Sequence, residues 1–294
     1  MEEPAGAPLD PGQSTGFYNW LSRFNLLMNL LRFGRVEADL TLHKALRVPP
    51  ELGPAYAGAA APLFINDRAL AAAELPAEPR VLDAGCGFGG TMFRWRERAG
   101  GTYDGLTSSP VQLRVARRAA ARRGLSACCR FQLRSYDQPP TGPYDAVVSI
   151  ESLIYSPRFE RTLDGLVATL EPGGKLILID DFPRAAAAGD RDLEALAKHW
   201  RLAAPPSDGA LDAWLAGSEL RLVHEEDLTD NVRTSPAARL QRLERRYTAA
   251  HALLPLVGGR FVLEALLGGL ALERLYRRGL VRYRLLVARR EKRA

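Results

Sequence analysis

The chain has 294 residues, of which 47% are hydrophobic and 25% charged, values ordinary for a globular protein with one large domain and additions, or at most two domains. The formal net charge of +6 comes mostly from dispersed arginines, without a zinc pattern or a basic block beside aromatic residues, so we expect no nucleic-acid partner. The three cysteines lack the spacing of a disulfide framework, and the N-terminus lacks the basic start and apolar core of a signal peptide. We therefore expect a cytoplasmic protein.

The first 75 residues are expected to be mainly helical. Residues 1–14 are acidic and rich in Pro and Gly, which predicts a flexible tail. Residues 17–48 carry aromatic and aliphatic side chains at helical spacing, which predicts one or two amphipathic helices ending before Pro49 and Pro50. With a further helix over 62–74, residues 15–75 form a predicted N-terminal cap.

From residue 80 onward, short apolar runs alternate with helical segments. The runs at 80–85, 100–109, 128–135, 144–150 and 175–182 read as strands, and helices follow from Pro110 and over 157–170. Such alternation predicts an α/β fold with a Rossmann-like, doubly wound, mostly parallel seven-stranded sheet and helical caps at both ends of the chain. Residues 76–183 form its predicted ligand-binding core.

The last third of the chain is expected to cover the core. Residues 184–275 are mainly helical with one late strand over 221–229, which predicts a substrate cap, and 276–294 hold a final strand and a basic tail. The stretch 252–272 is the most apolar, but Arg260, Glu264, a proline and four glycines argue against a membrane-spanning helix. A buried helix and a lipid-facing amphipathic helix both remain open, as do a peripheral membrane contact and a homo-oligomer.

The segment VLDAGCGFGG at 81–90 carries the main functional signal. A buried strand ends near Asp83, and Gly85, Gly87 and Gly89 let the backbone turn and approach a ligand closely. The helix that follows points its free N–H groups at that ligand, which favours an anion. Spacing alone indicates only a nucleotide-like ligand.

In its context, this segment resembles motif I of class I S-adenosylmethionine-dependent methyltransferases, with an acid two positions before the first glycine. The resemblance implies S-adenosyl-L-methionine as cofactor. It places Asp83 under the methionine end, and Gly85, Cys86, Gly87 and Gly89 beside the adenosine.

The segment GLTSSPVQ at 105–112 resembles the second-strand motif of one branch, which includes cyclopropane-fatty-acid synthases, sterol and tocopherol methyltransferases, and terpene C-methyltransferases. Most class I enzymes place an acid there on the ribose, but Thr107 holds that position here. The resemblance assigns the ribose to Thr107 and Gln112, with Ser108 beside them.

Two later segments complete the predicted cofactor site. Ser135, Tyr136 and Asp137 lie where the family contacts adenine, although a surface-turn role is as good a reading of Asp137. The segment YDAVVSIESLIYSP resembles the fourth strand of these enzymes, which assigns Ile150 to the cofactor. We expect no metal, because no His, Cys or acidic cluster has metal-ligand spacing.

Glu151 and Tyr155 are the candidate catalytic residues. C-methylation of an alkene leaves a carbocation, which a carboxylate and aromatic faces stabilise, and terpene and sterol C-methyltransferases resemble this chain in a Glu just past the fourth strand. Holding the cofactor or a loop is the alternative for Glu151. We treat all four histidines as surface or core residues, His199 being the best candidate for a pocket.

The sequence thus predicts a C-methyltransferase of secondary metabolism. The apolar area of the flanking helices favours a lipophilic acceptor, such as a terpenoid, prenyl or sterol-like compound. An O- or N-methyltransferase, and a binding protein without catalysis, remain the alternatives.

Overall fold

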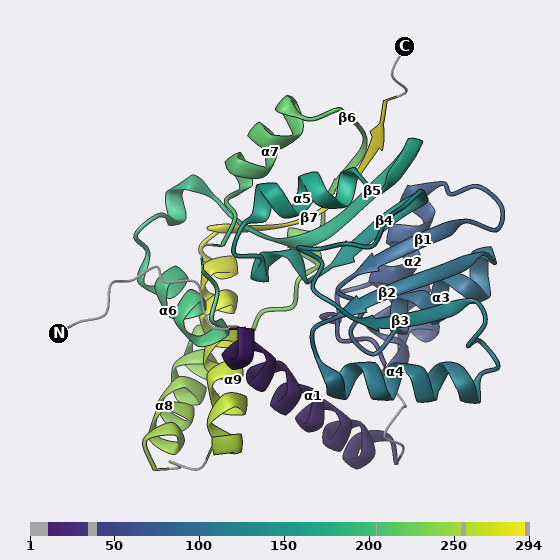
Figure 1. Cartoon of the computed structure of the whole chain (residues 1–294). Coiled ribbons are helices and arrows are strands. Elements are labelled where there is room, and N and C mark those ends of the chain that lie inside the picture. The colour runs from purple at the N-terminus through teal and green to yellow at the C-terminus, as the bar shows by residue number, and fades with distance from the viewer. Residues whose placement is uncertain (1–10, 35–39, 204, 254–256, 292–294) are drawn as a thin grey trace.

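A computed structural model describes residues 11–34, 40–203, 205–253 and 257–291, and its centre is a twisted sheet (Figure 1). The strands are β1 (Arg80–Ala84), β2 (Thr102–Thr107), β3 (Cys129–Leu133), β4 (Tyr144–Ile150), β5 (Leu170–Pro183), β6 (Leu220–Asp227) and β7 (Val281–Arg290). Their order is β3-β2-β1-β4-β5-β7-β6. Strand β7 runs antiparallel to both of its neighbours, β5 and β6, and the other neighbouring pairs are parallel. The predicted seven-stranded, mostly parallel sheet is confirmed.

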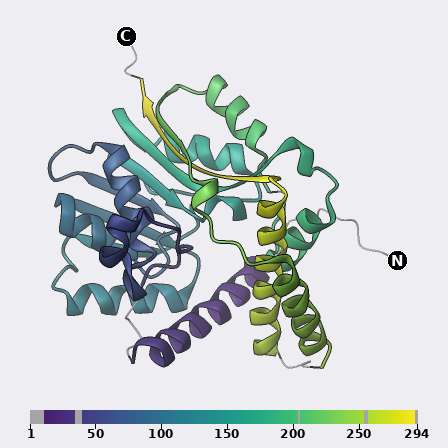
Figure 2. The ribbon, with the colours of Figure 1, turned by 180° about the vertical axis from the view of Figure 1, so that it is seen from behind.

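Helices cover both faces of the sheet. The residues of α2 (Leu63–Ala73), α3 (Gly90–Ala99) and α4 (Pro110–Arg122) pack with one face, and α5 (Phe159–Val167) and α7 (Asp208–Gly217) with the other. Because β1, β4 and β5 are covered on both sides, each has an apolar central run: residues 81–82 in β1, 146–148 in β4 and 176–179 in β5. Figure 2 shows the molecule from behind, with the face covered by α2 and α3 toward the viewer.

A second group of helices stands beyond one end of the sheet (Figures 1 and 2). It consists of α1 (Pro11–Phe33), α6 (Arg191–Trp200), α8 (Ala237–Leu253) and α9 (Val257–Arg277), with α9 packed against the other three and α1 reaching α4. Five 3-10 turns complete the described elements: Pro50–Tyr56, Gly58–Ala60, Leu153–Tyr155, Ala185–Ala187 and Thr229–Asn231.

The N-terminal region departs from its sequence prediction at two points. Helix α1 begins at Pro11, so the last four residues of the predicted tail are helical, while residues 1–10 lie outside the described residues. The helix expected over 17–48 ends at Phe33, and residues 40–49 are irregular. Leu40 and Leu46 are apolar because they are buried against the core, not because they continue a helix.

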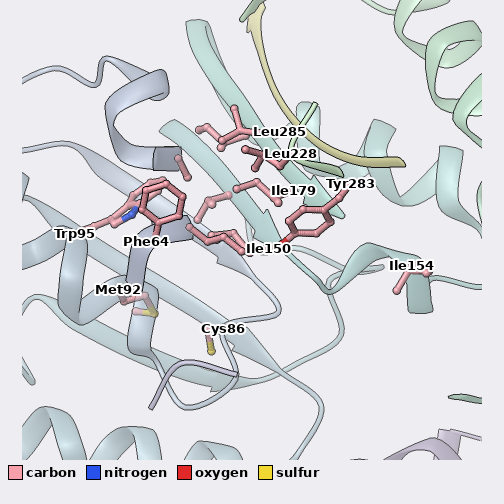
Figure 3. Packing of buried hydrophobic residues seen from close by; sticks show 14 of the residues in the cluster. Phe64, Cys86, Met92, Trp95, Ile150, Ile154, Ile179, Leu228, Tyr283 and Leu285 are labelled. Carbon is pink, nitrogen blue, oxygen red and sulfur yellow. The ribbon is translucent and has the colours of Figure 1, made fainter. Parts of the chain in front are cut away.

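The core between the sheet and α2 and α3 is closely packed (Figure 3). Trp95 is fully buried, and its indole N–H donates to the carbonyl of Asn66 at 2.9 Å. Ile150 and Ile179 extend this core along β4 and β5 to their carboxyl ends. Those strand ends are therefore held rigidly where the candidate site begins.

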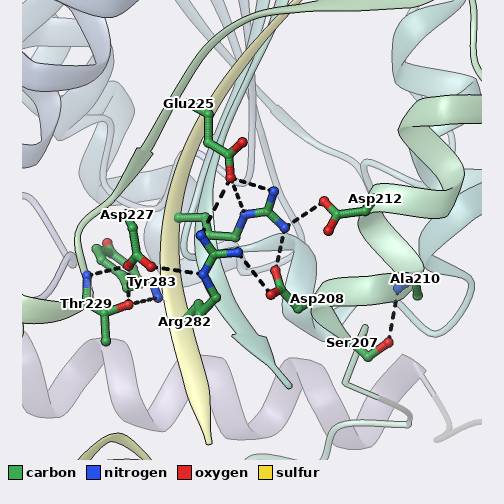
Figure 4. Close-up of polar contacts among 10 residues, drawn as sticks. Ser207, Asp208, Ala210, Asp212, Glu225, Asp227, Thr229, Arg282 and Tyr283 are labelled. Carbon is green, nitrogen blue, oxygen red and sulfur yellow. Dashed lines mark hydrogen bonds and ion pairs between the residues drawn. The ribbon is translucent and has the colours of Figure 1, made fainter. Parts of the chain in front are cut away.

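Arginine side chains of β7 form ion pairs with acidic residues of β6 and α7 (Figure 4). Arg284 is 2% exposed and pairs with Glu225 at 2.7 Å and with Asp212 at 2.8 Å, while Arg282 reaches Asp227 at 2.9 Å. A buried guanidinium needs such partners, since an unpaired charge there would be strongly destabilising. The network fixes β6 and α7 against β7.

Candidate active site

A cavity of about 770 Å³ opens at the carboxyl ends of the parallel strands, the edge at which α/β sheets bind ligands. The wall is formed by α1, residues 40–44, the loops after β1 to β4, the last part of β5, and parts of α6 and α9. Most of the site residues predicted from the sequence line it: Gly85, Cys86, Gly87, Thr107, Ser108, Gln112, Ser135, Tyr136, Asp137, Ile150, Glu151 and Tyr155. Asp83 and Gly89 do not.

The loop between β1 and α3 has no room for a side chain at Gly85 or Gly89. Gly85 has φ +107°, and a Cβ there would lie 2.4 Å from the Cβ of Ser152. Gly89, with φ +86°, precedes α3, and a Cβ there would meet the ring of Phe131 at 2.7 Å. Gly89 therefore serves the turn and its packing, whereas Gly85 keeps the backbone open to the cavity.

Asp83 lies beneath this loop. It is 4% exposed, its Oδ2 has no hydrogen-bond partner among the described residues, and burial raises its pKa to about 7. A buried carboxyl oxygen without a donor is costly, and such an atom is expected where a ligand or a water supplies the donor. The open glycine cradle and this oxygen fit a cofactor with an ammonium group.

Thr107 and Gln112, the two residues that the resemblance assigns to the ribose, are hydrogen-bonded to each other. The Thr107 hydroxyl donates to Oε1 of Gln112 at 2.6 Å and accepts the N–H of Ser109 at 3.1 Å. Ser109 caps α4 by accepting the N–H of Gln112, and it donates to Asn19 of α1 at 2.7 Å. A hydroxyl and an amide thus stand together at the end of β2, on the cavity wall.

Asp137 is occupied by neighbouring hydroxyls. Ser135 donates to its Oδ2 at 3.1 Å, and both Ser156 and Thr162 donate to its Oδ1. These bonds fasten the turn after β3 to the start of α5. They favour the turn-holding reading of Asp137 over direct adenine recognition, while Ser135 and Tyr136 remain on the cavity wall.

Glu151 follows β4 with φ +52°, a left-handed conformation that turns it out of the strand. Its carboxylate accepts the backbone N–H of Lys44 at 3.1 Å and the hydroxyl of Tyr283 at 2.7 Å, and the Lys44 ammonium lies 3.1 Å away. Burial works to raise its pKa, but the charges of Lys44 and His43 and these hydrogen bonds outweigh it and lower the pKa. Glu151 is therefore ionised near neutral pH.

Two aspartates at the end of β5 extend this charge, and we call Glu151, Asp180 and Asp181 the acidic wall. Asp181 binds the Lys44 ammonium at 2.8 Å and accepts the hydroxyl of Tyr276. Asp180 accepts the N–H groups of Ile154 and Asp181, and burial together with the Asp181 charge raises its pKa to about 7. The sequence analysis assigned these aspartates only to a strand, although adjacent acids at the carboxyl end of a parallel strand are a usable signal.

An aromatic cluster lines the same cavity. The Tyr155 ring stacks on Trp200 with centroids 6.1 Å apart and meets the edge of Tyr18 at 5.4 Å. Among the aromatic side chains outside the predicted core, Phe17, Tyr18, Phe24 and Trp200 line the cavity, whereas Trp20, Trp214, Tyr247 and Phe261 do not.

The histidine of the cavity is His43, which the sequence analysis treated as an ordinary surface or core residue. His43 lines the cavity, its Nδ1 has no partner among the described residues, and burial lowers its pKa. His199, the histidine favoured from the sequence, is not part of the lining. Over the described ranges, no three His, Cys, Asp or Glu residues are arranged to hold a metal.

The family and the fold agree on the class of protein. Residues 82–176 match the family model described as a methyltransferase domain. This part of the chain is therefore similar to a methyltransferase domain, and S-adenosyl-L-methionine is the cofactor that the similarity supports.

Two solved structures have a similar fold. A geranyl diphosphate methyltransferase in complex with geranyl diphosphate and sinefungin has a TM-score of 0.72 at 18% identity, over 95% of this chain and 99% of its own. A cyclopropane synthase from Mycobacterium tuberculosis has a TM-score of 0.71 at 18% identity, over 96% and 99%. At these identities the likeness shows the fold.

Among curated proteins, the chloroplastic tocopherol O-methyltransferase of Arabidopsis thaliana is 34% identical over 117 residues, which is 39% of this chain and 34% of that protein. The chain thus spans about a third of the length of this relative.

Proposed function

We propose that the protein is an S-adenosyl-L-methionine-dependent C-methyltransferase that acts on a lipophilic acceptor, such as a terpenoid, prenyl or sterol-like compound. One observation carries the proposal: the ionised Glu151 and the aromatic pair of Tyr155 and Trp200 line the cavity into which the glycine loop opens. In this proposal the enzyme works in the cytoplasm, in secondary metabolism, on a small molecule and not on nucleic acid.

The proposed chemistry requires little covalent participation by the protein. The bound cofactor supplies an electrophilic methyl group. Attack of an alkene carbon of the acceptor on that methyl carbon would form the new carbon–carbon bond and break the carbon–sulfur bond. The neutral thioether S-adenosyl-L-homocysteine would leave, and the carbocation left on the acceptor would lose a proton to Glu151. The faces of Tyr18, Tyr155 and Trp200 and the negative charge of Glu151 lower the energy of that cation. Glu151 is also a proton acceptor that is already ionised.

The cavity wall suits an apolar acceptor. Leu21 and Phe24 of α1 and Val262 and Leu266 of α9 face the space beside the aromatic cluster. Apolar walls exclude water, which strengthens the interaction of Glu151 with a cation. The geranyl diphosphate methyltransferase and the cyclopropane synthase share the fold of this chain, which agrees with this acceptor class.

We assign the cofactor to the glycine loop and to the ends of β2, β3 and β4. In this assignment Gly85, Cys86 and Gly87 pass beside the adenosine, Thr107, Ser108 and Gln112 hold the ribose, and Asp83 serves the methionine end. Ser135, Tyr136, Asp137 and Ile150 lie toward the adenine, with Asp137 acting through the turn that it fixes. Residues 15–75 and 184–275 are the caps over this core in the same proposal.

The test is a product analysis. The enzyme is incubated with methyl-labelled S-adenosyl-L-methionine and a panel of prenyl diphosphates, sterols, phenols and amines, with and without magnesium. A new carbon–methyl bond in an isoprenoid or sterol product supports the proposal. Label found on oxygen or nitrogen alone refutes it.

Asp180 favours a second candidate function, O- or N-methylation. A carboxyl with a pKa near 7 in the cavity wall is suited to take the proton of a hydroxyl or an amine near neutral pH. The tocopherol O-methyltransferase similarity agrees with this alternative. The same labelling experiment separates the two, since the alternative places the methyl group on a heteroatom of a phenol or an amine.

A further inference from the structure

Helix α1 presents an apolar stripe to solvent. Trp20, Leu27, Leu30 and Leu31 are 37%, 50%, 45% and 69% exposed, and their spacing puts them on one face of the helix. Below we call these four residues the α1 stripe. Exposed aliphatic side chains gathered on one helix face mark an interaction surface more often than isolated ones do.

The region around the stripe is strongly basic. Helices α1 and α4 contain no acidic residue, and α8 contains one, Glu244, which pairs with Arg274 at 3.2 Å. Exposed arginines share these helices: Arg23 and Arg32 on α1, Arg114, Arg117, Arg118 and Arg122 on α4, and Arg239, Arg242, Arg245 and Arg246 on α8. The three helices lie at the same lower edge of the molecule in both views (Figures 1 and 2). An apolar stripe among cations is complementary to an anionic lipid surface.

We propose that α1 docks this protein on an anionic membrane surface, with the α1 stripe inserted among the lipid headgroups. Arg23 lies over the ring of Trp20 at 5.2 Å, so that its stem can stay beside the apolar face while its charge reaches lipid phosphates. Among the described residues no helix is long and apolar enough to cross a bilayer, so the contact is made along the surface.

The proposal gives α1 two tasks. Other residues of the helix, among them Phe17, Tyr18 and Leu21, form part of the cavity wall. On α9, Leu266 both lines the cavity and is 36% exposed, whereas Leu267, Leu270 and Leu272 are buried. The described part of the apolar stretch 252–272 is therefore mostly packing, and the lipid-facing surface lies on α1. If the proposed lipophilic acceptor is dissolved in the bilayer, docking brings it beside the cavity.

The primary test uses the full chain without cofactor or acceptor. Sedimentation with vesicles of phosphatidylcholine alone and of phosphatidylcholine mixed with phosphatidylglycerol measures binding, and the emission of Trp20 reports insertion by a blue shift that Trp20→Phe abolishes. We expect binding only to the anionic vesicles, weakened by salt. The triple variant Leu27→Ser, Leu30→Ser and Leu31→Ser should lower binding by at least about tenfold, because three apolar side chains no longer leave water.

Two controls assign the effect to the α1 stripe and its charge. Leu222→Ser on β6 removes an aliphatic side chain that is 42% exposed, and it should leave binding unchanged. The double variant Arg114→Gln, Arg118→Gln removes two positive charges from α4. It should weaken binding to anionic vesicles by about fivefold for each charge that contacts the lipid surface.

Three outcomes would overturn the proposal. Equal vesicle binding by the triple variant and the original chain removes the stripe from the contact. A concentration-dependent dimer that the triple variant abolishes, without vesicle binding, assigns the stripe to a second copy. If the original chain does not bind vesicles and the triple variant has a lower Tm, the stripe serves packing within the chain.

This inference rests on the proposed function only for the route of the acceptor. Methyl transfer to an acceptor dispersed in detergent tests the function without lipid, and the stripe residues do not line the cavity, so the triple variant should keep that rate. Loss of vesicle binding with intact methyl transfer therefore concerns the membrane alone. Vesicle binding without methyl transfer concerns the proposed function alone.

Discussion

Lys44 and Glu151, 107 residues apart in the chain, are joined twice: the Lys44 backbone N–H donates to the carboxylate at 3.1 Å, and the Lys44 ammonium lies 3.1 Å from it. The same ammonium binds Asp181 at 2.8 Å and stands over the ring of Tyr283 at 4.1 Å. A residue outside every recognisable motif therefore sets the charge of the proposed catalytic carboxylate.

Glu151→Gln removes that charge and keeps the size of the side chain. We expect kcat for methyl transfer to fall by about 100-fold or more, the range found when a positioned acid or base is lost. The affinity for S-adenosyl-L-methionine, measured by calorimetry, should stay within a few fold. The exposed Glu97→Gln is the matched control and should leave both values unchanged. An unaltered kcat in Glu151→Gln ends the catalytic assignment.

Lys44→Met should move the pH dependence of catalysis. Lys44 lowers the pKa of Glu151, so its removal raises that pKa, and the ionised form is then lost at a higher pH. The acidic limb of the pH profile of kcat is expected to shift upward. Lys44→Arg should restore the original limb. A merely structural lysine would lower the rate at every pH without moving the limb.

Asp83 makes folding stability depend on pH. Its pKa is about 7 in the folded protein against an ordinary 3.8, so its contribution is fully present below the lower value and is lost as the pH rises through the higher one. In the chain without cofactor, that loss amounts to about 4 kcal/mol at most. Urea unfolding across this range should show a shallower decline for Asp83→Asn. Asp180 follows the same rule, so the double variant with Asp180→Asn should decline least. An unchanged decline in the double variant would contradict both pKa shifts.

Gly85→Ala tests the glycine cradle. Its new Cβ would lie 2.4 Å from Ser152 in a backbone conformation that side chains rarely adopt. We expect a loss of about 2–4 kcal/mol in the free energy of unfolding, from overpacking and strain, together with loss of cofactor binding. Gly209→Ala, in α7 with open space around it, is the control and should change neither. Comparable effects of both variants would show that the backbone at Gly85 has no particular need for a glycine.

Tyr155 separates the role of an aromatic face from that of a hydroxyl. Tyr155→Leu should lower kcat by about 30-fold, since a cation over a desolvated ring is worth about 2 kcal/mol. Tyr155→Phe should keep most of the rate. The reverse order, with Leu active and Phe inactive, would point to the hydroxyl and to a different step.

The sheet could be predicted from the sequence because a parallel strand covered on both faces is mostly apolar, as β4 is with only Asp145 and Ser149 as polar residues beside its tyrosine. Thr107 and Gln112 were singled out by a motif of local residues, and the structure shows their side chains hydrogen-bonded to each other. Both features depend on neighbours in the sequence.

The contribution of residues 40–44 to the candidate active site could not be predicted in the same way. Residues 40–44 have the apolar spacing of a helix, yet Leu42 lies over Gly87 and Lys44 reaches Glu151. Those contacts bring together segments that are far apart in the chain, and nothing in local periodicity encodes them. His43 was placed wrongly for the same reason, because its neighbourhood exists only after the segment has folded across the glycine loop.

The acidic wall also governs which molecules the cavity admits. Glu151 and Asp181 stand together against the single ammonium of Lys44, so negative charge already exceeds positive charge there, and the excess grows once Asp180 ionises. A reacting end that bears a carboxylate or a phosphate would be repelled and would lose its hydration without compensation. A neutral, electron-rich end meets no such barrier. Discrimination among acceptors therefore begins with electrostatic exclusion, and it sharpens as the pH rises through 7.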